Sequence, residues 1–172
     1  MARSRFFGAL LFIVVAAAFR LIPHPPNFSP IAAMALFGAA AFDRKAWAFI
    51  LPLAAMLLSD AVIGFHDQMA AVYGSFILIE MLGLTLLRDK RTPVRIGAAA
   101  LGGSVIFFVV TNLSVWAFSG GYEKSAAGLA TCFVAALPFF QNTIAGDLVF
   151  TGALFGAWAL VERTLAKRAE AV

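Results

Sequence analysis

Long apolar runs alternate with short polar or charged segments along the whole chain. The charged and turn residues separate six apolar runs, most of them near the roughly 20 residues that cross a hydrocarbon core about 30 Å thick. This pattern predicts an all-α fold, a polytopic membrane helical bundle with six transmembrane helices in a single domain over residues 1–172. The predicted spans cover about residues 6–22, 27–42, 46–65, 69–87, 96–118 and 142–161.

Two segments have alternative interpretations. Residues 125–141 are apolar but too short to cross the membrane, and their apolar stretch ends at Pro138. They form either a short re-entrant or interfacial segment or the first part of one kinked helix with the sixth span. The first run, FFGALLFIVVAAAF after MARSR, also resembles a signal peptide, whose cleavage would leave five spans.

The basic residues are distributed unevenly between the loops. Arg20 and Lys124 fall on one predicted side of the membrane, and eleven Lys and Arg residues fall on the other, in the four remaining loops and tails. Positive charge near span ends resists translocation, so the side with eleven is predicted to be cytoplasmic, together with both termini. The eleven residues are Arg3, Arg5, Arg44, Lys45, Arg88, Lys90, Arg91, Arg95, Arg163, Lys167 and Arg168.

The composition also indicates a membrane protein. Hydrophobic residues make up 62% of the chain and charged residues 13%, against about 45–50% and about 25% in soluble domains. The net charge of +4 lies in short loops and tails rather than on one helix face, so no nucleic-acid partner is expected. The single cysteine, Cys132, excludes an internal disulfide.

Unusual polar residues gather toward the predicted outer face. Polar groups within apolar spans are costly, so they face the bundle interior, pair with one another or mark a site. One interpretation is an outward-facing substrate pocket, in which Asp67 and Tyr122 also take part. The alternative is an internal lock, such as Arg20 with Asp60 or Asp147, that only holds helices together. The predicted pocket residues are Arg20, His24, Asp60, His66, Tyr73, Asn112, Trp116, Gln141, Asn142 and Asp147.

Other candidate chemistry is weaker. Glu80, deeper in the fourth span, is either a proton-coupling carboxylate or a neutral acid bonded to a neighbouring helix. Asp60 and His66 match no specific zinc spacing, and Cys132 is interpreted as an inert buried thiol rather than a metal ligand. No metal, cofactor or catalytic residue is predicted. Walker A, GxGxxG and HExxH motifs are absent, so a pump would draw its energy from another subunit or an ion gradient.

Small residues spaced one turn apart mark close helix packing in lipid. Three pairs have this spacing: Ala35 with Ala39, Ala98 with Gly102, and Gly152 with Gly156. We expect them to make contacts inside the bundle, although one could be the docking face for a partner.

Several motifs resemble those of a family of small bacterial membrane proteins. They are Arg20-Leu-Ile-Pro-His-Pro-Pro-Asn-Phe-Ser-Pro, Leu58-Ser-Asp with Gly64-Phe-His, and Pro138-Phe-Phe-Gln-Asn-Thr with Gly146-Asp. That family is distantly similar to the S components of energy-coupling-factor vitamin transporters and to solitary S-component-like proteins linked to cobalamin uptake. The resemblance implies a six-helix bundle in the bacterial cytoplasmic (inner) membrane, with a vitamin-sized pocket near the outside.

The resemblance also implies a function and partners. The loops that close an S-component pocket correspond here to segments carrying His24, His66 with Asp67, and Tyr122. The Ala-x3-Ala motif that often docks an energising membrane subunit is missing from the first span, which puts dependence on such a subunit in doubt. The leading hypothesis is uptake of a vitamin or corrinoid-like solute. The alternatives are an assembly subunit of a membrane complex and a membrane-embedded metal-dependent enzyme.

Overall fold

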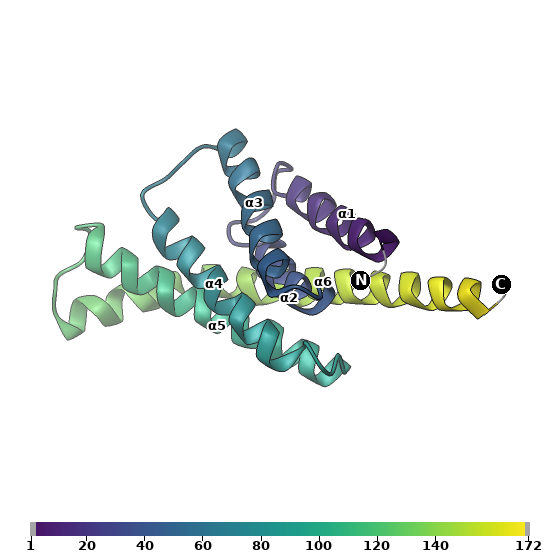
Figure 1. The fold of residues 1–172 in the computed structure, drawn as a ribbon. Coiled ribbons are helices and arrows are strands. Elements are labelled where there is room, and N and C mark those ends of the chain that lie inside the picture. The colour runs from purple at the N-terminus through teal and green to yellow at the C-terminus, as the bar shows by residue number, and fades with distance from the viewer. Residues whose placement is uncertain (1–2, 171–172) are drawn as a thin grey trace.

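The computed structural model describes residues 3–170, and within this range every regular element is an α-helix (Figure 1). Four of the six helices, α3 to α6, are long and apolar enough to cross a membrane. This confirms the helical, membrane-type class; α1 begins and ends three residues before the predicted span 6–22, and α2 is shorter than predicted. The helices are α1 (Arg3–Phe19), α2 (Ile31–Ala41), α3 (Lys45–Ile63), α4 (Met69–Leu86), α5 (Pro93–Phe118) and α6 (Ala126–Glu170).

Helix α2 begins four residues later than the predicted span 27–42. The preceding segment carries four prolines, which lack the amide hydrogen of a helix interior, and Asn27 adopts a left-handed turn with φ 63°. Pro30 occupies the N-cap position. At 1.5 Å per residue the 11 residues of α2 rise about 16 Å, roughly half of a hydrocarbon core.

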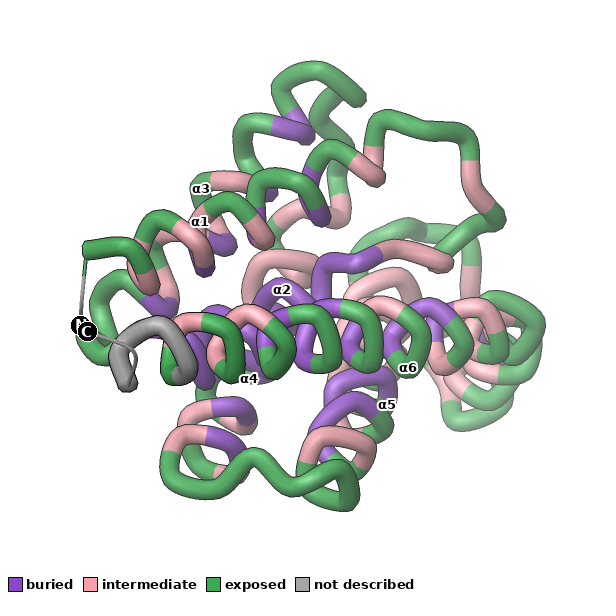
Figure 2. The backbone as a smooth tube through the Cα atoms, turned by 90° about the vertical axis from the view of Figure 1, so that its right-hand side faces the viewer, coloured by how far each residue is buried: buried purple, intermediate pink, exposed green. Residues whose placement is uncertain are grey.

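Helix α2 is the centre of the bundle. All 11 of its residues are buried, and it packs against each of the other five helices (Figure 2). Its sequence, IAAMALFGAAA, is apolar on every face, as expected for an enclosed helix. Small residues permit the close approach: a Cβ on Gly83 of α4 would lie 2.8 Å from that of Ala39. The Ala35 and Ala39 pair is therefore an internal contact, as predicted.

We expect Gly38→Val to destabilise the bundle by about 1–3 kcal/mol. A Cβ at Gly38 would lie 2.7 Å from the ring of Pro52 and 3.0 Å from the carbonyl oxygen of Ala48, both rigid neighbours. Thermal unfolding of the purified protein in detergent measures this loss of stability. Gly74→Val is the matched control, because a Cβ on that helical glycine meets nothing within 4 Å. Equal loss in the two variants would assign the effect to helix propensity rather than to packing.

Helix α6 is a single helix from Ala126 to Glu170. Residues 125–141 therefore do not form a separate re-entrant segment; from Ala126 they continue into the predicted sixth span, as in the second interpretation. Pro138 lies inside the helix without ending it, which membrane helices tolerate when neighbours satisfy the freed carbonyl. The 45 residues extend about 68 Å. This helix is longer than a hydrocarbon core and runs across the whole of Figure 1.

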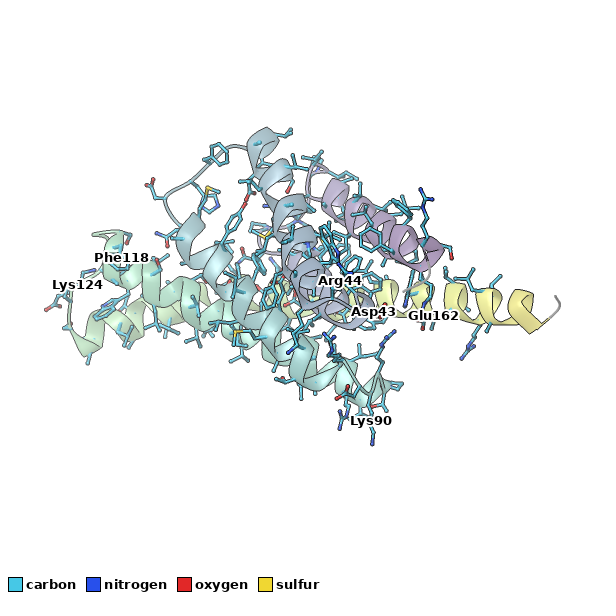
Figure 3. The ribbon with its side chains drawn as sticks, in the orientation of Figure 1. Asp43, Arg44, Lys90, Phe118, Lys124 and Glu162 are labelled. Carbon is cyan, nitrogen blue, oxygen red and sulfur yellow. The ribbon has the colours of Figure 1, made fainter. Side chains whose placement is uncertain are left out.

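The predicted basic segments meet at one end of the bundle, here called the basic end. Glu162 of α6 pairs with Arg5 of α1 and with Arg91, whose Nη1 lies 3.4 Å away. Arg88 donates to the carbonyl of Asp43 at 2.5 Å. Figure 3 shows Asp43 and Glu162 far from the loop between α5 and α6, which lies at the opposite end. This end is called the outer end below, because the charge count predicts that it faces outward. The side chains of Lys167 and Arg168 lie outside the described part of the chain.

Candidate functional site

A cavity of about 330 Å³ lies at the outer end of the bundle. Its walls come from α2, α3, α4, α5 and α6, together with the two loops that follow α1 and α3. Four of the predicted pocket residues line it directly. The lining residues are Arg20, His24, Asn27, Ser29, Ile31, Ala32, Ile63, His66, Val72, Phe76, Phe107, Thr143 and Asp147.

The cavity lies at the N-terminus of α2, which begins four residues later than predicted. Because the central helix begins only at Ile31, its first residues, Ile31 and Ala32, form part of the cavity wall. The first amide groups of a helix have no intrahelical acceptor, and no side chain of Pro30 caps them. The start of α2 therefore places the positive end of a helix dipole in the cavity wall, and its first amides have no hydrogen-bond acceptor among the described residues.

Arg20 joins three helices at the side of the cavity. Its Nη2 donates to Asp60 Oδ1 at 2.6 Å, and its Nη1 donates to Ser59 and to the carbonyl of Met56. Tyr73 donates to the second oxygen of Asp60 at 2.7 Å. The side chains of Arg20 and Asp60 are 11% and 2% exposed. This network is the internal lock that the sequence allowed, with Asp60 as the partner of Arg20.

Asp147 is the second buried carboxylate at this end. It is 3% exposed and lines the cavity, and its Oδ2 accepts a hydrogen bond from Ser104 of α5 at 2.6 Å. It forms no ion pair with any described residue. A carboxylate in this position has no neighbouring cation to offset the free-energy cost of removing its charge from water. Its remaining acceptor capacity is directed to whatever fills the cavity.

The loop after α1 is held against α6. Asn142 donates to the carbonyl of Pro26 at 3.0 Å. A Cβ on Gly146 would lie 3.1 Å from the backbone nitrogen of Ser29, so a larger residue would push the loop away from α6 by a few tenths of an ångström. His24 is fixed within the same loop by a 2.7 Å hydrogen bond between Nδ1 and the carbonyl of Ile22. The predicted residues Asn142 and His24 thus shape the cavity entrance.

Three predicted pocket residues lie elsewhere. Asn112 donates to the carbonyl of Phe108 within α5, and Trp116 donates to the carbonyl of Glu123. Trp116 lines a separate outer groove with Asp67, whereas Gln141 is exposed on α6. The end of α5 and the start of α6 project beyond the other helices, at the left of Figure 1, which removes these side chains from the cavity.

Glu80 and Cys132 also lie outside the cavity lining. Glu80 is fully buried in α4, and neither of its oxygens has a hydrogen-bond partner among the described residues. Cys132 is buried with its Sγ 3.5 Å from the carbonyl of Asn112.

Several cavity residues were not predicted from the sequence. Phe76 and Phe107 stack with ring centroids 5.6 Å apart, and both line the cavity beside Thr143. Single Phe and Ser residues are common in apolar helices, so the sequence did not mark these two rings, or the Ser104 that bonds Asp147, as part of a site. Thr143 did carry one, because it shares a helical face with Asp147 at four-residue spacing.

An all-helical bundle with apolar outer faces and a small polar cavity defines the chain as a membrane-type helical protein. The chain belongs to DUF6580, a family of unknown function, whose model matches residues 1–169. No curated protein and no solved structure matches it. The similarity to vitamin-transporter S components therefore stays a prediction.

Proposed function

We propose that this protein binds a small organic solute in the outer cavity and takes part in its uptake into the cell. The observation that carries the proposal is the convergence of a helix N-terminus, a buried carboxylate and two stacked rings on one 330 Å³ space. Small-molecule sites combine an apolar lining with a few convergent polar groups in this way. The positive-inside rule predicts that the basic end is cytoplasmic, which supports a cavity that opens to the outside.

The groups that line the cavity favour a solute that carries a hydrogen-bond-accepting or anionic group and, elsewhere, a donating group. The free amides at the start of α2 suit an anionic or hydrogen-bond-accepting group. Asp147, without a cationic partner among the described residues, suits an ammonium or other donating group. Phe76 and Phe107 suit an apolar or ring portion. A small zwitterion or a polar heterocycle meets these requirements.

The volume restricts the size of the solute. Known ligand pockets measure about 300–1,000 Å³, and 330 Å³ lies at the lower end of that range. A one-ring or two-ring solute is therefore favoured over a corrinoid, which is far larger. Energy for uptake would come from an ion gradient or a separate membrane subunit, since the sequence carries no nucleotide-binding motif.

Native mass spectrometry of the protein purified gently from its own host tests the proposal. We expect a bound solute of small mass in the wild type and its loss in Thr143→Phe, because the ring would fill the cavity beside the 5% exposed Thr143. Thr131→Phe is the control, as Thr131 is exposed on the same helix. A solute retained equally by both variants would place the site elsewhere. A bound polypeptide with no solute would favour the assembly-subunit alternative.

A further inference from the structure

A second groove lies at the basic end, between the first half of α5 and the last half of α6, with a volume of about 560 Å³. It is lined by Gly97, Ala100, Gly152, Gly156 and Ala159, among others. A Cβ on any of its three glycines would meet nothing within 4 Å. The predicted Gly152 and Gly156 contact is therefore not internal: these glycines leave a furrow that no described residue fills. Ala98 and Gly102 differ, since Gly102 packs against Leu82 of α4.

A buried donor lines this groove without an acceptor. Trp158 is 2% exposed, and its indole Nε1 has no hydrogen-bond partner among the described residues. An N–H group in an apolar setting without an acceptor costs several kcal/mol. The ring of Trp158 packs against Phe12 of α1 and Phe37 of α2, so this residue forms the apolar floor of the groove on its bundle side.

The mouth of the groove carries positive charge. Arg91 and Arg163 line it together with Glu162. Glu162 is already shared between Arg91 and Arg5, whereas Arg163 forms no ion pair with a described residue. Two arginines against one carboxylate leave the mouth cationic. This charge is complementary to an anionic group at the membrane surface.

We propose that this groove binds an anionic phospholipid from the leaflet at the basic end. The phosphate lies at Arg91 and Arg163, and an acyl chain lies along the furrow of Gly152 and Gly156. Arg163 and Gly156 are seven residues apart, two turns of α6, so they lie on one face of the helix and a single lipid reaches both. A partner helix would fill the furrow, but its apolar surface would not match the cationic mouth.

Native mass spectrometry in detergent with added lipid tests this assignment. The full chain is incubated with phosphatidylglycerol or with phosphatidylcholine of the same acyl chains. We expect preferential retention of phosphatidylglycerol, weakened about fivefold for each of Arg91→Gln and Arg163→Gln. Gly152→Leu should exclude both lipids by filling the furrow.

Controls separate this site from general lipid adhesion. Lys45→Gln removes a cation at the same end but outside the groove lining, and Gly74→Leu adds the same bulk on α4 away from it. Both should retain phosphatidylglycerol as the wild type does. Equal retention of the two lipids by the wild type would overturn the proposal. So would a dimer, or a bound polypeptide, that disappears in Gly152→Leu, because a helix would then be the occupant.

Discussion

Arg20→Ala should lower the free energy of unfolding by about 3–5 kcal/mol, the range found when one member of a buried ion pair is removed. The substitution leaves the carboxylate of Asp60, which is 2% exposed, with only Tyr73 as a hydrogen-bond donor. Arg20 lies just after α1, Asp60 in α3 and Tyr73 in α4, so the loss should loosen three helices at the outer end together. Unfolding of the purified protein by titration with SDS, followed by far-UV circular dichroism, measures the change.

Two further variants show whether the pair itself is responsible. Arg20→Leu combined with Asp60→Leu removes both charges and should recover most of the lost stability, because no unpaired charge remains. Lys90→Ala removes a cation that is exposed in the loop between α4 and α5 and should change stability by less than about 0.5 kcal/mol. If Arg20→Ala were as stable as Lys90→Ala, the cluster would not be a lock, and Arg20 would be free to bind the solute.

The sequence predicts where the helices begin and end better than which face of each helix points into the bundle. The bounds of α3, α4 and α5 lie within three residues of the apolar runs that charged and turn residues delimit. The basic segments also meet at one end, as the charge count indicates. Both features depend on strong local signals. The family match adds no functional information, because the family itself has no known function.

The depth of the polar residues was predictable, but their contacts were not. The sequence allowed Arg20 to pair with Asp60 or with Asp147, and the structure selects Asp60 and gives Asp147 a serine 43 residues away. Helices that are apolar on every side give no signal about which face points inward, so cross-helix partners cannot be assigned from spacing. The same limit explains why Asn112 and Trp116 were grouped with the cavity.

The cavity itself depends on a short helix that the sequence obscures. The apolar run of residues 27–42 predicted a full span, whereas the structure begins α2 at Ile31. Asn27 and Ser29 then become lining residues instead of the first turn of a helix. An unbroken helix would have filled this space. The prolines of the preceding loop are thus the sequence feature that leaves this cavity open.

Asp147→Asn should weaken binding of the co-purifying solute at least about thirtyfold, as expected when one partner of a buried charged contact is neutralised. The amide keeps the size of the side chain, and its oxygen can still accept from Ser104, so the fold should be retained. The solute identified by mass spectrometry is removed by dialysis in detergent and returned in an isothermal titration. Asp67→Asn, an outer-loop change outside the cavity lining, should bind as the wild type does. If Asp147→Asn retained full affinity while Thr143→Phe abolished binding, the carboxylate would serve only to hold α5 against α6, and recognition would rest on the start of α2 and the two rings.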